Sequence, residues 1–325
     1  MTTYPPPQGS PVGAPPVAGP PPGAGPQAAP PGAPYVCRYC RLPSDASGSS
    51  CPNCGAPVDV RAVVSDSGWV EQPAIKDMAR IQFGQSRCQI EGTLVPSVDF
   101  NLAQGEGVIF SHHTLLWTGP DTHLEQWAQG GFFQRMYAGM PLFLMRATGP
   151  GHVALSEDHP GEVVALPIPP GRGFVVKEHA FLACSEGIQY TWQNSPVWLE
   201  VREGQDEVEF EYPIGPYVDL FVAAGQRPGL LLLHCPGNLF VRDLGPGQTI
   251  LVQPSAVVYS DTSINYSLHC EYPNAGGMSF WGSYNYRTIW LRLTGPGRVA
   301  VRSIFEKPER YPGIVASSGM THARW

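Results

Sequence analysis

Short apolar runs separated by glycine, proline and asparagine fill the chain from residue 76 to residue 306. Runs rich in Val, Ile, Leu, Phe, Tyr and Trp between turn residues are typical of short β-strands, and many in succession favour a sandwich or barrel. The best helix candidate is Leu124–Tyr137, but its Gly130-Gly131 pair disfavours a helix. We therefore expect an all-β fold, a β-sandwich domain over residues 76–306.

The apolar runs also repeat along the chain. Gly105–Trp117, Gly171–Ala183 and Gly247–Tyr259 each contain a glycine, three mostly apolar residues, a polar break and a second apolar run. A Gly/Pro turn followed by a strand recurs at 147–155, 234–241 and 293–301. Chance reuse of Gly-Pro turns, which suit β proteins, stays open as an explanation. The alternation of both elements predicts a core of three similar β units packed on one another.

The ends of the chain differ from this pattern. Residues 1–34 are almost only Pro, Gly and Ala, and they hold much of the chain's 36 Pro and 37 Gly. Such a segment buries too little apolar surface to offset the entropy of ordering, so we expect a disordered, proline-rich tail. We expect a zinc ribbon at 35–59, a linker at 60–75 and an irregular C-terminal tail at 307–325.

Four cysteines in the segment 35–59 follow the pattern C-x2-C, ten residues, C-x2-C: Cys37, Cys40, Cys51 and Cys54. Two residues between thiolates let one turn place both sulfurs on the same ion, and two such knuckles give the tetrahedral four-sulfur site that zinc prefers. A segment this small needs metal binding to supply folding free energy. We predict one structural zinc ion, because four thiolates leave no position open for water.

Other interpretations of these cysteines stay open. Iron in a rubredoxin-like site uses similar knuckles, although normally with a longer gap. Two disulfides would require an oxidising compartment, and a redox-active C-x-x-C would require a βαβ context. The neighbouring Tyr39 fits an exposed aromatic contact and core packing equally well.

Composition and charge limit the partners and the compartment. The net charge of -7 argues against broad contact with nucleic-acid phosphates or anionic lipid. The N-terminus has no secretory signal, and no run approaches the length of a membrane-spanning helix. We therefore expect a cytoplasmic protein. The scattered cysteines suit small buried apolar residues: Cys88, Cys184, Cys235 and Cys270.

The β domain offers no constellation for catalysis. A cupin-like metalloenzyme needs several histidines and a carboxylate that converge, but the adjacent His112 and His113 would point to opposite faces of a strand. The remaining histidines are dispersed, and nucleophile-elbow, Walker A and dinucleotide motifs are missing. We expect that the chain is not an enzyme and has no catalytic or cofactor-binding residues beyond the metal ligands.

The repeats carry a family resemblance. Residues from about 81 to 303 resemble the family of altered inheritance of mitochondria protein 24, through GEGVIF, GRGFVV and GQTILV, GGFFQRMYAGMPLFLMRATGPGHVAL, PGEVVALPIPPGRGFVVKEHAFLA and IWLRLTGPGRVAV. The resemblance implies a β-sandwich similar to the tryptophan RNA-binding attenuation protein and no established enzymatic activity. Mitochondrial members are tied to inner-membrane organisation. This chain adds the cysteine segment and a proline-rich leader unlike a transit peptide, so a bacterial cytoplasmic setting fits better.

These features together favour a non-enzymatic adaptor or scaffold. The ribbon and tail would recruit protein partners, and the β domain would associate with itself or with another protein. Nucleic-acid binding through the ribbon and a β-barrel metalloenzyme are the alternative functions. Peripheral membrane attachment is a further alternative, through one aromatic-rich segment: Trp127, Phe132, Phe133 and Met136.

Overall fold

The structure is a computed structural model that describes residues 35–37, 39–44, 50–56, 67–72, 75, 77–127, 144–203, 207–271, 288–306, 314–317 and 321–323. Within these ranges the chain forms β-strands and two single-turn 3-10 helices. The expectation of an all-β sandwich is confirmed. The expected disordered tail at 1–34 lies outside the described residues.

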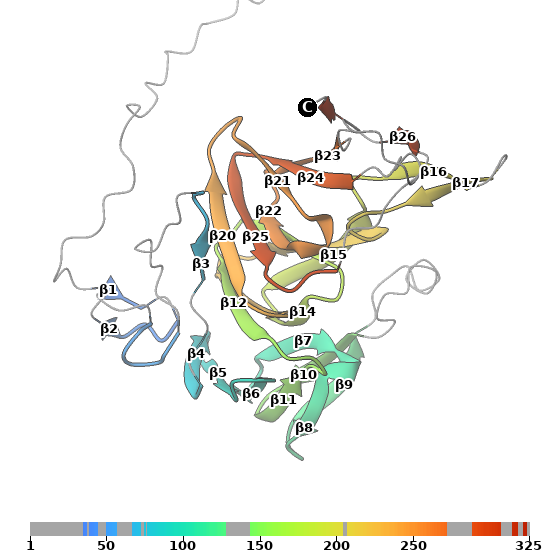
Figure 1. Cartoon of the computed structure of the whole chain (residues 1–325). Helices are drawn as coiled ribbons and strands as arrows, with labels where there is room; N and C mark the ends of the chain where they lie inside the picture. The colour runs from blue at the N-terminus through green and yellow to red at the C-terminus, as the bar shows by residue number, and fades with distance from the viewer. Residues whose placement is uncertain are drawn as a thin grey trace, which may run out of the picture.

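Four sheets lie in layers, running in Figure 1 from the end of the molecule that carries β8 to the end that carries β23 and β24. The strands pair antiparallel, except that β27 runs parallel to β23. The first sheet contains, in order, β4 (Ala79–Phe83), β5 (Ser86–Glu91), β6 (Ser97–Leu102), β11 (Gly151–Ser156) and β8 (Leu115–Thr118). The second sheet contains β12 (Glu162–Ile168), β19 (Gly229–Cys235), β14 (Phe181–Ser185), β7 (Gly107–Ser111), β10 (Leu144–Thr148) and β9 (His123–Trp127).

The third and fourth sheets continue the layers. The third contains, in order, β15 (Ile188–Asn194), β18 (Tyr217–Ala223), β13 (Gly173–Lys177), β22 (Val257–Asp261), β25 (Gly297–Arg302), β20 (Leu239–Leu244) and β3 (Val70–Glu71). The fourth contains β21 (Thr249–Val252), β24 (Thr288–Thr294), β23 (Asn265–Glu271) and β27 (Thr321–Ala323). There are also two small sheets. One contains, in order, β17 (Glu207–Glu211), β16 (Leu199–Glu203) and β26 (Ile314–Ser317), and the other pairs β1 (Tyr35–Val36) with β2 (Pro43–Ser44).

Three hydrophobic cores fill the spaces between the layers. The first core lies between the first and second sheets, the second core between the second and third, and the third core between the third and fourth. Strand β19 is buried along its whole length because its side chains alternate between cores. Leu232 packs in the first core and Leu231 in the second. An unbroken apolar run is what a strand with two covered faces requires.

The three sequence repeats each form a strand, a short break and a second strand. The pairs are β7 and β8, β13 and β14, and β21 and β22, and the breaks in the first and third are the 3-10 turns at His112–Thr114 and Pro254–Ala256. In every pair the two strands belong to different sheets, so the break carries the chain from one layer to the next. The predicted repetition of β units is present in the structure.

The second repeated element also connects layers. It joins β10 to β11, β19 to β20 and β24 to β25, and each pair again spans two sheets. The Gly149-Pro150 and Gly295-Pro296 peptide bonds in the first and third of these turns are cis. Each unit therefore contributes strands to two neighbouring layers, and the sheets in the middle are shared between units.

Some segments differ from the expectations. Within the helix candidate Leu124–Tyr137, residues 124–127 belong to β9, which pairs with β10, and the rest lies outside the described residues. Sheet pairing thus overrides the weak helical pattern. In the segment expected to be a linker, β3 pairs with β20. In the segment expected to be an irregular tail, β26 pairs with β16 and β27 with β23.

Candidate metal centre

Two backbone turns of the same geometry carry the four cysteines of the segment 35–59, which we call the cysteine module. In each turn the first cysteine N–H donates to the carbonyl five residues later, and the N–H four residues later donates back to the cysteine carbonyl. These bonds are Cys37 to Leu42 (3.0 Å), Arg41 to Cys37 (2.8 Å), Cys51 to Ala56 (2.8 Å) and Gly55 to Cys51 (2.8 Å). The cysteines are the first and fourth residues of each turn, so these bonds hold both of its sulfurs close to one point.

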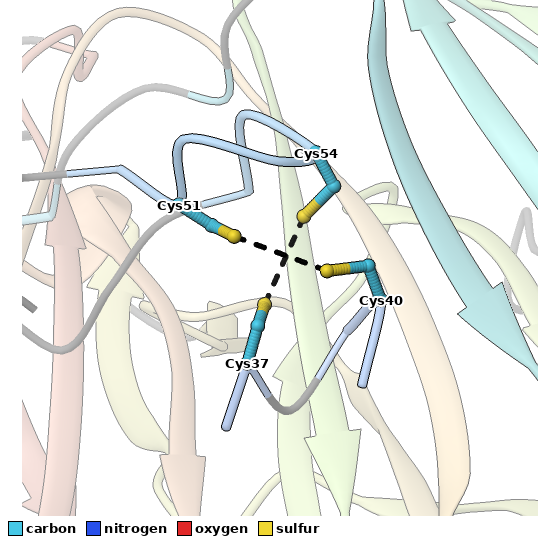
Figure 2. Close-up of side chains that lie close together, drawn as sticks. All are labelled: Cys37, Cys40, Cys51 and Cys54. Carbon is cyan, nitrogen blue, oxygen red and sulfur yellow. Dashed lines mark hydrogen bonds between the residues drawn. The ribbon is translucent and has the colours of Figure 1, made fainter. Parts of the chain in front are cut away.

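The four sulfur atoms surround a common centre. All four lie within 4.8 Å of one another, with Cys37 Sγ 3.7 Å from Cys54 Sγ and Cys40 Sγ 3.9 Å from Cys51 Sγ. Figure 2 shows the side chains pointing inward, with these two pairs crossing. A tetrahedral ion with metal–sulfur bonds of about 2.3 Å requires sulfurs about 3.8 Å apart, whereas a disulfide requires about 2.05 Å. The spacing fits a four-thiolate metal ion and not a pair of disulfides.

The surroundings of the sulfurs shift the pKa values of three of the thiols in different directions. Burial raises the pKa of the Cys37 and Cys54 thiols. Burial also acts to raise the pKa of Cys51, but its hydrogen bond with the Ser44 hydroxyl and those from the N–H groups of Asn53 and Cys54 outweigh it and lower that pKa to about 6. The thiolate is the form that binds a metal, and the surroundings of Cys51 favour that form.

The module covers the edge of the first sheet. Strand β4 is the outer strand there, and its outward N–H groups donate to knuckle carbonyls: Arg80 N–H to Cys54 O (2.8 Å) and Gln82 N–H to Tyr39 O (3.0 Å). An exposed sheet edge invites pairing with other chains, and covering it is one way that proteins prevent this. The sequence contains no local signal for this contact, because the two segments are joined only by tertiary packing.

Tyr39 belongs to the core and not to an exposed surface. Its side chain is buried, and its hydroxyl donates to the Ala165 carbonyl on β12 at a distance of 3.0 Å. The buried cysteines of the module pack in the first core with residues such as Ile81 and Phe100. The structure thus resolves the choice that the sequence left open, and it makes the module one body with the β domain.

The other candidate ligands stay apart. Within the described ranges, the cysteine cluster is the one group of three or more His, Cys, Asp or Glu side chains close enough to hold a metal. His112 and His113 lie on a 3-10 turn and not on a strand, which corrects the geometry expected from their spacing. The scattered cysteines are buried, as expected of small apolar residues: Cys88, Cys184, Cys235 and Cys270.

The structure describes only one residue of the segment considered for membrane attachment. Trp127 is half-buried at the end of β9, while Phe132, Phe133 and Met136 lie outside the described residues. Among the residues that the structure describes, no helix has the length and apolar character to cross a bilayer.

Comparison with known proteins assigns the family. The sequence profile of the mitochondrial biogenesis AIM24 family matches residues 88–304. A Streptococcus pyogenes protein solved by X-ray crystallography is similar in structure at 19% identity and a TM-score of 0.49, over 68% of this chain and 94% of that one. No curated protein matches the chain significantly. The match spans most of the described β domain, and the chain therefore belongs to the mitochondrial biogenesis AIM24 family.

Proposed function

We propose that this chain is a non-enzymatic scaffold of the AIM24 family that holds one structural zinc ion and uses its β domain for protein–protein association. The observation that carries the proposal is the closed four-sulfur cluster, with all sulfurs within 4.8 Å of one another. Four thiolates fill the tetrahedral shell of zinc, so no position is left for water or substrate. The chemistry of such an ion is to stabilise a fold.

The place of the cluster supports this role. The knuckle carbonyls hold the edge of β4, and the module shares the first core with the β domain. Metal binding to a small module contributes directly to folding free energy. The ion then acts as a brace for a sheet edge. Four thiols gathered at spacings that fit metal ligands also suit a reducing compartment, which supports a cytoplasmic location.

Metal analysis of the purified full chain tests the metal. We expect one zinc per chain, a loss of that zinc in Cys51→Ser, and full retention in the matched control Cys184→Ser, whose thiol is buried in the second core, away from the module. The absorbance of a ferric tetrathiolate would instead assign iron. A second tightly bound metal that persists in Cys51→Ser would contradict the non-enzymatic assignment.

In this scaffold the cysteine module also recruits a protein partner, and one of its surfaces offers a test of that role. Val36 and Leu42 are exposed apolar side chains that flank the first knuckle and are not metal ligands. We expect Val36→Ser/Leu42→Ser to keep its zinc and to lose in-cell cross-links between the module and a partner protein. The matched control is Leu94→Ser, which changes an exposed leucine in the turn between β5 and β6. Unchanged module cross-links in the double variant would refute a recruiting role for this surface.

A further inference from the structure

The middle sheets contain the same strand junction twice. In the second sheet β7 pairs with β14, with Phe110 opposite Ala183. In the third sheet β13 pairs with β22, with Val176 opposite Tyr259. The repeats align Phe110 with Val176 and Ala183 with Tyr259. The first strand of one unit therefore joins the second strand of the following unit in one conserved register.

At each end of the stack, one strand of the type that forms this junction has no junction partner among the described strands. Strand β8 is the second strand of the first unit, and within the described residues it pairs only with β11. Strand β21 is the first strand of the third unit, and in the same described ranges it pairs only with β24. Each is thus a sheet edge at the position where its counterparts in the other units continue into a neighbour.

Strand β8 exposes the apolar residues that its counterparts bury. Leu116 is 53% and Trp117 45% exposed, although they stand where the next unit has Leu182 and Ala183, both fully buried. The same irregularity in strand pairing occurs at this position in each unit. The register shifts between Phe181 and Ala183 on β14 and between Val257 and Tyr259 on β22. On β8 it shifts between Leu115 and Trp117, which pair with Leu155 and Ala154. Strand β8 therefore has the features of a joining strand, and none of the described strands pairs with its second edge.

Strand β21 shows the complementary exposure. Leu251 is 43% exposed, whereas its counterparts Ile109 and Val175 are buried. Its neighbours Ile250 and Val252 are buried in the third core. One face of β21 is thus covered by the third core. The other face exposes a leucine at the position where the inner units have buried core residues.

The packing of the repeats shows where these side chains would go. Leu182 belongs to the first core and its counterpart Val258 to the second, so the position advances by one core per unit. If the same progression is followed back to the first unit, Leu116 would belong to a core in front of the first one. Ile109 lies in the second core and Val175 in the third, so Leu251 belongs to a core that follows the third.

A single chain does not join its own two edges. The first and fourth sheets are the outer layers of the stack, and Figure 1 places β8 and β21 toward opposite ends of the molecule. A second copy of the chain would provide both missing halves. Its β21 would pair with the open edge of β8, its third core would receive Leu116, and its own β8 edge would remain free for the next copy.

We propose that copies of this chain assemble head to tail, with β8 of one copy paired antiparallel to β21 of the next, Trp117 opposite Val252. The register is that of the two internal junctions. The joint sheet would have the order β6-β11-β8 followed by β21-β24-β23, which matches β12-β19-β14 followed by β7-β10-β9 in the second sheet. Because the two surfaces differ, the assembly is heterologous, and it closes as a ring or continues as a filament. The inference does not depend on the metal, and it names a second copy as one partner of the scaffold.

Two edge variants test the proposal with the full chain. A lysine on a sheet edge opposes pairing, so Trp117→Lys blocks the β8 edge and Leu251→Lys blocks the β21 edge. Light scattering after size exclusion should give multiples of the 35.2 kDa chain for the wild type and for the control Leu94→Lys. Each edge variant alone should be monomeric. A mixture of the two should form a one-to-one dimer, because one intact edge of each kind remains.

Three results would overturn the proposal. They are a wild type that stays monomeric at high micromolar concentration, an edge variant that still assembles by itself, and a mixture of the variants that stays monomeric. The zinc content of both variants should equal that of the wild type, which separates this test from the test of the metal. Native-like circular dichroism of each variant excludes unfolding as the cause of a monomer.

Discussion

Two backbone amides on β4 report directly on the cysteine module. The N–H groups of Arg80 and Gln82 donate to the carbonyls of Cys54 and Tyr39 in the knuckles. They exchange with solvent only when the module leaves the sheet edge. We predict that removing the metal with a chelator selectively accelerates hydrogen exchange at these two amides, because a metal-free module loses its fixed knuckles.

The contacts set the size of the effect. Undocking the module breaks the two backbone bonds and the bond from the Tyr39 hydroxyl to the Ala165 carbonyl. At about 1 kcal/mol for each bond, the three contribute about 3 kcal/mol. Since about 1.4 kcal/mol corresponds to a factor of ten, exchange at both amides should accelerate on the order of 10²-fold.

Residue-resolved hydrogen exchange by NMR provides the assay and its controls. Successive N–H groups of an antiparallel strand point to opposite sides, so the amide of Ile81, whose register partner is Cys88, faces β5 and should change far less. Leu231 in β19 should not change at all, because it packs in the second core, away from the module. If the chelated protein retains full protection at Arg80 and Gln82, the module stays docked without metal and the reasoning is wrong.

Three further perturbations have defined outcomes. Tyr39→Phe leaves the buried carbonyl of Ala165 without its hydroxyl donor, and it should cost about 1–3 kcal/mol in urea unfolding at unchanged zinc content. Gly55→Ala places a side chain at a φ of 72° and should weaken zinc binding by about 1 kcal/mol in a chelator competition, whereas Arg41→Gly, at the equivalent φ of 60°, should not weaken it. Burial raises the pKa of Glu162 to about 7, so the folded state binds more protons than the unfolded state between pH of about 4.3 and 7. Stability from this group falls as pH rises through that window, and Glu162→Gln should reduce the difference in melting temperature between pH 5 and pH 8.

Local patterns in the sequence were sufficient to predict the strands, the repeats and the meeting of four cysteines. The run Leu230–Leu233 indicates a buried strand, and β19 is buried on both faces. The spacing of Cys37, Cys40, Cys51 and Cys54 predicts that their sulfurs meet, and they lie within 4.8 Å of one another. Each of these features depends on residues that are close in sequence, for which turn geometry and side-chain periodicity give direct rules.

Contacts between distant segments could not be predicted in this way. Tyr39 is separated by 126 residues from the carbonyl that accepts its hydrogen bond, and its identity fits a surface contact as well as a core. The polar breaks in the repeats also look like ordinary hairpin turns. The structure shows that they carry the chain to the next sheet, which depends on packing between layers and not on the turn residues alone.

The repeats explain why the open sheet edges at β8 and β21 cannot be predicted from the sequence. A strand is encoded by its own apolar residues, and these are alike whether or not a neighbour is present, so the run containing Leu116 and Trp117 resembles the run containing Leu182 and Ala183. The difference is in exposure and appears only when the units are placed in order. A linear row of units that join by one repeated contact must end with two unmatched surfaces, and those surfaces are complementary because the same contact joins every pair inside the row. Where no cap covers such an end, as the cysteine module covers β4, another copy of the row offers the complementary surface against which its apolar side chains can pack.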